Sequence, residues 1–422
     1  MNGFNLSDIT DAKLGATTLG GIYLGSTKLW PLSTDYSKEY FTIESLADNN
    51  TITWTFTGST PMQNYIYWSK NGTSWTSAIV STSDTPVSLA TLNKGEKMYL
   101  KGENIKYASS SSNYSHFNSD YEFNVSGNIM SLIYGDNFIG QTTLSSSYNF
   151  VGIFKSSKVY DASNLILPAT TLADYCYSNM FNGCASLVTA PVLPATTLAS
   201  SCYHSMFYKC TSLATAPVLP ATTLAKSCYY YMFYGCTSLT TAPELPATTL
   251  VNNCYGYMFE GCSSLITAPE LPATTLANSC YMSMFAATKI TAAPELPATI
   301  LSDSCYRNMF YGCTSLRYPP TLNATILQPR CYQHMFFGCT SLKTAPELPA
   351  TTLVTYCYAY MFQNCTSLSY IKCLATNISA SNSHNWWLYN VASTGTFVKP
   401  APMSSWPANA HGIPSGWTVV NV

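Results

Sequence analysis

The chain has 422 residues and a formal net charge of −1, and only 9% of its residues are charged. Ordinary soluble proteins carry roughly 25% charged residues, so uncharged polar side chains and tyrosine must cover most of this surface. The near-zero net charge excludes a typical nucleic-acid-binding protein, which needs a basic face. A hydrophobic fraction of 47% excludes an intrinsically disordered chain. Two or three domains are expected at this length.

The first fifteen residues, MNGFNLSDITDAKLG, lack the basic stretch, apolar core and small-residue cleavage site of a secretory signal. No apolar run approaches the roughly 20 residues that a membrane-spanning helix needs, so we expect no insertion into a membrane. Synthesis and folding in the cytosol are expected, unless a signal preceded this sequence and was removed.

Residues 1–35 combine glycines with a short apolar alternation that includes Ile22, Tyr23, Leu24 and Trp30. The stretch IYLGSTKLW resembles an opening found in structural proteins of bacteriophages of gut bacteria, just before a β-rich module. The resemblance implies that this segment anchors the chain to other virion proteins, with those four residues in contact. An ordinary β-hairpin without an anchoring role is the alternative.

Residues 36–128 show the alternation of apolar and polar side chains that is typical of β-strands, for example over 40–43, 51–56 and 97–100. Asn71-Gly72 and Lys94-Gly95 are turn signals between such runs. Several short strands in about 90 residues predict a small immunoglobulin-like β-sandwich. The stretch from Ser69 to Trp75 resembles the Asp-box hairpin of sialidases, which is a structural turn and implies no glycosidase activity.

A repeat dominates the rest of the chain. The motif LPATTL, or a close variant, begins at Leu167, Leu193, Leu219, Leu245, Leu271, Leu296, Leu322 and Leu348. Every step is 26 residues except one of 25, which passes through Phe285–Thr288, where one residue and the second cysteine of the unit are missing. A fixed period of this kind predicts stacked units with a continuous core.

The consensus of the units contains the sequence CYxxMFxGCTSL. In the first unit Cys176 and Met180 are spaced i, i+4, which predicts a short helix that buries one stripe and ends at Gly183. Prolines restrict the following extended segment to a brief strand. One unit cannot bury its own apolar stripe, so we expect a solenoid over residues 129–373.

Degenerate units should close both ends of this solenoid. The segment upstream of Leu167 keeps the end of the unit but has no cysteines. In the C-terminal cap, residues 374–422, Ser383, Trp387 and Val391 stand at the positions of Cys, Met and Cys. The closing segment with Trp406 and Trp417 is expected to wrap the last coil or to form a tip.

The sixteen cysteines follow the repeat, and none lies before residue 176. Their spacing within a unit, C-x7-C, is not a zinc-binding pattern, and no histidines accompany it. A reduced cysteine behaves as a small buried hydrophobic residue, which is the interpretation we favour. Stacked disulfides and a metal site are the alternatives.

The repeated motif MFxGCxSL resembles the BspA-like leucine-rich repeats of bacterial surface proteins, over about residues 150–391. The resemblance implies a right-handed solenoid of about nine coils with a binding or adhesion role and no catalysis. The expected fold is therefore mainly β with short helices, with an immunoglobulin-like sandwich before the solenoid. Unlike bacterial members, this sequence shows no secretion signal.

No catalytic constellation is recognisable. The five histidines are scattered, and neither a GxSxG motif nor a phosphate-binding glycine loop is present. We therefore expect no enzyme and no cofactor.

The two residues between CY and MF vary from unit to unit, although the rest of the unit is nearly invariant. They should point outward and form a candidate ligand-contact ribbon, because Tyr, Asn, His and Arg are common in recognition surfaces. The candidates are Tyr230, Tyr231, Tyr257, Arg307, Asn308, His334 and Tyr360. Neutral variation on a solvated face is the alternative.

A second row carries Glu244, Glu270 and Glu295 at one position of successive units, with Glu347 further along. Like charges about 5 Å apart repel each other, so a cation bridging the first three is one interpretation. Ordinary solvation without any metal is the interpretation we favour.

These features predict a non-enzymatic virion protein, a head or tail fibre or decoration, that displays the solenoid to a bacterial surface protein or glycan. Homo-oligomeric assembly is expected, and the location is the virion. The alternative is a bacterial cell-surface adhesin, and a cytosolic scaffold is a third interpretation.

Overall fold

The computed structural model describes residues 35–59, 62–80, 85–401, 403, 406–407, 409 and 411–422, and before them the backbone of four short strands. These strands are β1 (Lys13–Leu14), β2 (Thr17–Thr18), β3 (Ile22–Leu24) and β4 (Thr27–Trp30). β1 pairs with β2 and β3 with β4, both antiparallel. The predicted anchoring residues Ile22, Tyr23, Leu24 and Trp30 lie in β3 and β4, and their side chains lie outside the described part of the chain.

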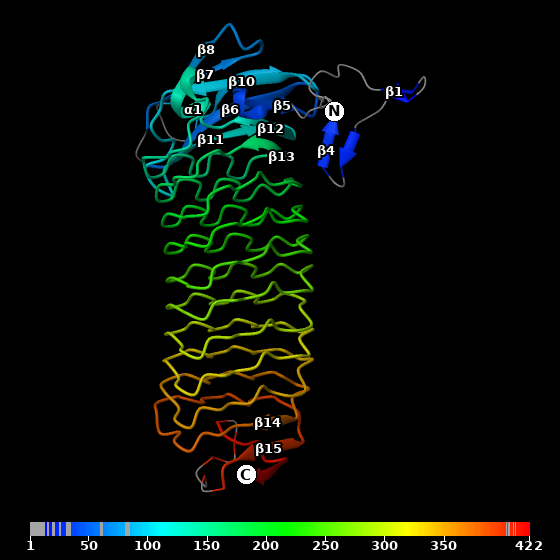
Figure 1. The fold of residues 1–422 in the computed structure, drawn as a ribbon, viewed down its shortest axis with the longest axis vertical. Helices are drawn as coiled ribbons and strands as arrows, with labels where there is room; N and C mark the ends of the chain where they lie inside the picture. The colour runs from blue at the N-terminus through cyan, green and yellow to red at the C-terminus, as the bar shows by residue number, and fades with distance from the viewer. Residues whose placement is uncertain are drawn as a thin grey trace, which may run out of the picture.

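Residues 36–137 and strand β13 form two β-sheets, which we call the two-sheet module (Figure 1). The larger sheet has the order β13-β12-β5-β10-β7-β8, and the smaller has the order β11-β6-β9. The strands are β5 (Phe41–Ser45), β6 (Asn50–Thr57), β7 (Asn64–Ser69), β8 (Thr76–Val80), β9 (Val87–Leu92), β10 (Lys97–Gly102), β11 (Tyr114–Ser119), β12 (Phe123–Asn128) and β13 (Val159–Ile166). The short helices η2 (Tyr36–Lys38), α1 (Ser131–Tyr134) and η3 (Gly135–Asn137) complete it.

The core of the module lies between its two sheets. Phe41 of β5 contacts Phe117 of β11 with ring centroids 5.6 Å apart, and Trp54 of β6 lies 4.4 Å from Phe117. Side chains of β6 alternate in burial, as expected for a strand with one face on a core. The immunoglobulin-like character of the module stays a prediction.

The module and the repeats share one core. Strand β13 pairs in parallel with β12 of the module and also bridges, at Asp161, to Thr189 of the first cysteine-containing unit. The ring of Phe154 lies 5.7 Å from Phe41 on one side and 5.2 Å from Phe181 on the other. The larger sheet therefore continues directly into the repeats.

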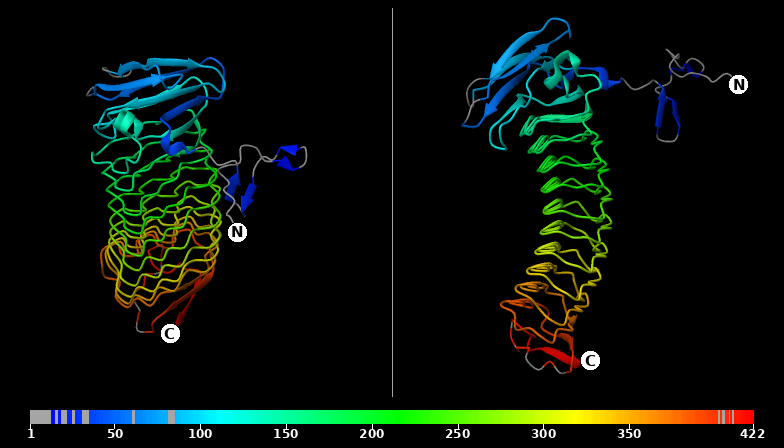
Figure 2. Two further views of the ribbon diagram at one scale, coloured as in Figure 1. Left: turned by 45° about the horizontal axis from the view of Figure 1, so that its top comes forward. Right: turned by 60° about the vertical axis from the view of Figure 1, so that its left-hand side comes forward.

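Residues 141–394 form stacked coils, one per sequence unit, which we call the repeat stack (Figures 1 and 2). Equivalent residues of neighbouring coils form parallel bridges, for example Thr215 with Thr241 and Thr241 with Thr267. The prediction of a β-rich repeat protein is thereby confirmed. α1 is the one α-helix in the described part of the chain, and no helix there is long and apolar enough to cross a bilayer.

The predicted helix within each unit is wrong. The segment is a run of consecutive turns in which alternate N–H groups donate within the coil and to the next coil. Met232 N donates to Tyr229 O at 3.1 Å, whereas Phe233 N donates to Met258 O of the next coil at 3.0 Å. Every fourth residue is left-handed, with φ of 58° at Tyr231 and 68° at Gly235. Recurrent positive φ is incompatible with a right-handed helix, and the hydrogen bonds between coils compensate for it.

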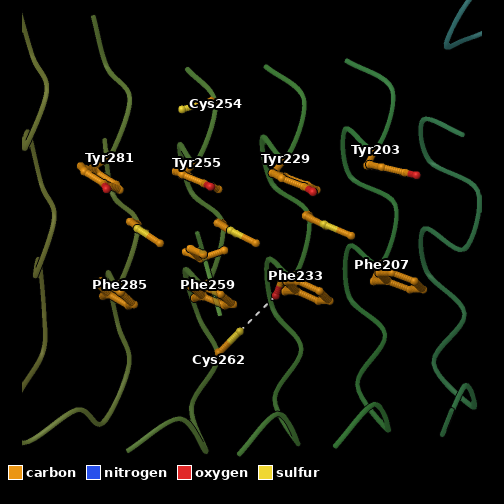
Figure 3. Close-up of a cluster of buried hydrophobic side chains, with 14 of the residues drawn as sticks. Tyr203, Phe207, Tyr229, Phe233, Cys254, Tyr255, Phe259, Cys262, Tyr281 and Phe285 are labelled. Atoms are coloured by element: carbon orange, nitrogen blue, oxygen red, sulfur yellow. Dashed lines mark hydrogen bonds between the residues drawn. The ribbon is translucent and has the colours of Figure 1, made fainter. Parts of the chain in front are cut away.

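The turn run fully buries two residues and leaves most of the next two only partly buried, so the invariant residues form columns through the stack (Figure 3). Tyr229 and Tyr255 stack with centroids 5.8 Å apart and ring planes 4° apart, and Phe233 and Phe259 stack at 5.7 Å and 1°. The spacing of the Cys and Met positions fits this four-residue period as well as it fits a helix.

All sixteen cysteines are buried, and none forms a disulfide. The thiol of Cys262 donates to the carbonyl of Phe233 in the preceding coil at 3.0 Å (Figure 3). Burial raises the pKa of Cys262 to about 12. The second cysteine of a unit therefore combines a small apolar volume with a weak hydrogen bond between coils.

In the 25-residue coil the second cysteine position is filled rather than lost. Thr288 occupies it, is buried, and donates its hydroxyl to Phe285 O at 2.8 Å. Ala287 takes the left-handed glycine position with φ of 56°. The missing residue therefore belongs to the following loop, where Lys289 alone separates Thr288 from the buried Ile290.

The C-terminal segment covers the last coil. Strands β14 (Tyr370–Lys372), β15 (Gly395–Lys399) and β16 (Trp417–Asn421) form a parallel sheet at this end (Figure 1). Trp387 is buried at the methionine position and stacks on Trp406 with centroids 5.1 Å apart. Its indole N–H donates to Gly412 O at 3.1 Å, so large aromatic rings close the open end of the core.

Candidate functional site

The predicted ligand-contact ribbon lies on the outer face of the turn run, where all seven candidates are partly buried against one another and the coil. Tyr230, Tyr231 and Tyr257 form one cluster. Tyr231 lies 4.5 Å from each of the other two rings, perpendicular to Tyr230 and nearly parallel to Tyr257. Gly256 makes room for this packing, because a Cβ atom there would lie 2.7 Å from the Tyr230 ring.

The other predicted residues lie further along the stack. His334 and Tyr360 stack with centroids 4.6 Å apart. Burial, and then the charge of Arg307, lower the pKa of His334 to about 4. The coil that carries Ser283 separates this group, with Asn308, from the first cluster. The ribbon is thus two aromatic groups rather than one continuous surface.

A second outward column, at the position after the conserved phenylalanine, was missed at the level of sequence. Tyr208 and Tyr234 stack in it with centroids 4.8 Å apart and planes 5° apart. The Tyr231 ring stands at 73° to Tyr234 at a centroid distance of 5.5 Å. This position also varies from unit to unit, and the four-residue turn period places it beside the ribbon.

The two columns enclose a hollow of about 360 Å³ on the outer face of four successive coils. We call it the tyrosine hollow. It is lined by Asn182, His204, Ser205, Tyr208, Tyr231, Tyr234, Tyr257 and Glu260.

Glu260 is the one acidic side chain in the lining of the tyrosine hollow. Its Oε2 atom is buried without a hydrogen-bond partner, and burial raises the pKa of the carboxyl to about 7. Within the described part of the chain, no ion pair involves Glu260. Lys209 Nζ lies over the Tyr208 ring, 5.5 Å from its centroid. The hollow therefore holds a carboxyl group without a fixed counter-charge.

The glutamate row lies elsewhere on the coils. Glu244, Glu270 and Glu295 are exposed, and the first two line a shallow, proline-rich depression of about 470 Å³. Glu347 pairs with Lys372 at 3.0 Å. No group of three His, Cys, Asp or Glu side chains suited to a metal occurs among the described residues. Solvation of these carboxylates, without a bridging cation, stays a prediction.

Comparison with known proteins agrees with the repeat. The family model for the BspA type leucine rich repeat region matches in six copies, over residues 137–266, 174–317 and 274–394. No curated protein and no solved structure matches the chain. Because the matched residues span more than half of the sequence, the chain belongs to the BspA-type leucine-rich repeat family.

Proposed function

We propose that this protein is a non-enzymatic binding protein whose repeat solenoid presents the tyrosine hollow to a bacterial surface protein or glycan. The observation that carries the proposal is the clustering of unit-specific side chains around one hollow, which Tyr231 and Tyr257 line and against which Tyr230 packs through Tyr231. Family membership supports a surface or adhesion role in general terms.

The contrast between invariant core side chains and variable outward side chains within each unit supports binding. The invariant Cys, Tyr, Met and Phe side chains fill the core, and backbone hydrogen bonds join the coils. The outward side chains lie outside this core, so they can differ from unit to unit with little loss of stability. Tyrosine offers a large contact area at a low cost in side-chain entropy, and its ring packs well on sugar faces.

The proposed location is the virion of a bacteriophage, where the N-terminal segment with Ile22, Tyr23, Leu24 and Trp30 binds other virion proteins and the chain assembles as a homo-oligomer. The resemblance of IYLGSTKLW to phage structural proteins supports this. The stack also extends away from the end of the molecule at which the two-sheet module lies (Figure 1). We propose an immunoglobulin-like fold for that module.

Mass spectrometry of purified particles tests the location. Peptides of this chain at a fixed stoichiometry to capsid or tail proteins are expected. Detection in the bacterial envelope, from a reading frame that carries a secretion signal, would instead establish the alternative, a cell-surface adhesin.

Binding is tested with the triple variant Tyr230→Ser, Tyr231→Ser and Tyr257→Ser, measured against whole bacterial cells and glycan arrays. We expect at least about a tenfold loss, because clustered aromatic residues dominate binding energies. The matched control replaces Tyr160, Tyr318 and Tyr370 by Ser. These tyrosines are exposed on the strand side of the coils, and their loss should leave binding unchanged. Equal binding by both variants and the wild type contradicts the proposal.

A further inference from the structure

The two-sheet module contains a complete site for an ammonium group. Lys101 Nζ lies 4.3 Å from the centroid of the Trp75 ring and 2.7 Å from Asp136 Oδ1. The hydroxyl of Tyr40 donates to the same carboxylate oxygen at 2.7 Å. Only 16% of the Lys101 side chain is exposed. An aromatic face and a carboxylate together hold the cation here, each through its negative potential.

The tyrosine hollow repeats this arrangement without the cation. Tyr208, Tyr234 and Glu260 occupy the same position on three successive coils. Because Tyr208 and Tyr234 stack face to face, the free face of the Tyr234 ring turns toward the coil of Glu260. Tyr231 stands perpendicular beside it and forms a corner with Tyr234. The rings and the carboxyl group are thus in place, and the cation is the missing part.

The part of the hollow on the two coils furthest from Glu260 forms a polar wall. Asn182, which stands in the same column as Tyr208 and Glu260, lines it together with His204 and Ser205, and the three offer amide, imidazole and hydroxyl groups. A volume of about 360 Å³ lies in the range of small-ligand sites and exceeds what a bare ammonium group requires. A ligand that fills the site needs one cationic group beside Glu260 and several hydroxyl groups for this polar wall.

We propose that the tyrosine hollow binds an amino sugar of a bacterial surface glycan, with its ammonium group between the Tyr234 ring and the Glu260 carboxylate. The inference rests on the proposed function, because it assigns a ligand class to the same contact surface. It favours a glycan over a lysine-rich peptide, because the polar wall suits sugar hydroxyl groups and the tyrosine rings suit a sugar face.

The charges around Glu260 make this binding dependent on pH. Tyr231 and Tyr234 face the carboxyl group, and burial raises the pKa of both phenols, so they stay neutral. Burial lowers the pKa of His204, so it is also neutral near pH 7. Lys209 lies over Tyr208 and forms no ion pair with Glu260. An ammonium ligand favours the ionised carboxyl, so binding must strengthen as Glu260 loses its proton.

The test is calorimetric titration of the full chain with 6-amino-6-deoxyglucose and, as the matched neutral ligand, glucose. We expect the amino sugar to bind at least about tenfold more tightly at about pH 8, with the affinity falling about tenfold by about pH 5.5. The aliphatic ammonium stays charged over this range, so the change reports on the protein. Trilysine, which carries the cation without the sugar, should bind weakly.

The matched variants are Glu260→Gln and, on the proline-rich side of the coils, Glu244→Gln. Glu260→Gln should remove both the preference for the amino sugar and its pH dependence, and Glu244→Gln should change neither. Thermal melts check that both variants fold. Unchanged binding by Glu260→Gln overturns the inference.

The remaining outcomes separate this inference from the proposed function. Equal affinity for glucose and the amino sugar rejects the role of charge and leaves glycan binding intact. Tighter binding of trilysine rejects the glycan and leaves a cation site. A chain that binds cells through its tyrosines but binds none of these probes overturns the inference alone.

Discussion

The two-sheet module and the repeat stack satisfy their polar groups in different ways. In the module the partly buried ammonium group of Lys101 is paired, through its contacts with both Trp75 and Asp136. Coils of the stack are held by backbone hydrogen bonds to the next coil and by thiols that donate to carbonyls. Its outer side chains lie outside the core columns, and the Oε2 atom of one of them, Glu260, has no hydrogen-bond partner. Because backbone hydrogen bonds already join the coils, the side chains of the outer face can vary and take part in binding.

The largest expected effect concerns the cysteines, all of which lie in the stack. Burial raises the pKa of Cys262 to about 12 and similarly protects the other fifteen thiols. Because the thiolate is the reactive form, a thiol reagent at about pH 8 should modify the native chain about a thousandfold more slowly than the unfolded chain. Counting modified thiols by mass spectrometry checks this. Rapid labelling of several cysteines in the native protein contradicts a closed core.

The second effect tests whether the columns carry the stability of the stack. Phe259→Ala removes one ring from a continuous column and should lower the free energy of unfolding by about 3–5 kcal/mol. The control is Phe337→Ala on the partly exposed outer column, for which about 1 kcal/mol is expected. Denaturant unfolding measures both. An equal decrease in the free energy of unfolding for both variants contradicts the distinction between core and outer side chains.

The third effect concerns the paired charge of the module. Lys101→Met keeps much of the aliphatic side chain but removes the ammonium group, and it should cost about 1–2 kcal/mol of stability. The control, Lys94→Met, changes an exposed turn residue and should cost almost nothing. Differential scanning calorimetry compares the two. A similar small effect for both would show that the Trp75 cluster does not contribute to stability.

The smallest effect concerns the unpaired carboxyl of the stack. Burial raises the pKa of Glu260 in the folded chain from its usual value of 4.5 to about 7, so the folded state favours the protonated form. The stability that this group contributes is complete below about pH 4.5 and is lost as the pH rises through about 7. Glu260→Gln should therefore stabilise the chain at about pH 8 by about 1 kcal/mol, a discounted value because the carboxyl is only half-buried.

At about pH 4, where the wild-type carboxyl is protonated in both states, Glu260→Gln should have almost no effect on stability. Glu244→Gln provides a baseline without this pH dependence, because that carboxylate is exposed. Unfolding curves at several pH values distinguish the variants. If the free energy of unfolding depended on pH in the same way for the wild type and for Glu260→Gln, the raised pKa would be contradicted.

Much of the stack could be predicted because its signal is repeated many times. The 26-residue period, the buried Cys, Tyr, Met and Phe positions and the replacement of Met by Trp387 at the C-terminal end all follow from aligning the units. The helix assigned to Cys176–Phe181 was wrong because a spacing of four residues fits both a helix and a run of turns. The missing residue was placed within Phe285–Thr288, rather than in the following loop, because a one-residue gap has no unique position in an alignment.

The candidate site could be predicted only in part. Tyr230, Tyr231 and Tyr257 were recognised because they vary within an otherwise invariant unit. Tyr208, Tyr234 and Glu260 vary in the same way, but the position after the invariant phenylalanine was not included among the variable outward positions. The hollow itself depends on the stacking of four coils, which brings the two columns together.

By itself the sequence determined that identical units must stack, because the apolar stripe of one unit has no partner within that unit. The low charge of the chain follows from the same repeat, since each coil places its apolar residues in a shared core and covers its outer side mainly with Thr, Ser, Asn and Tyr. Tertiary structure alone decided whether each N–H group bonds within its coil or to the next coil, because hydrogen-bond partners 25 residues apart leave no local pattern. This pattern of hydrogen bonds determines which residues are left-handed and which pairs point outward. It thereby places the unpaired Glu260 among tyrosine rings.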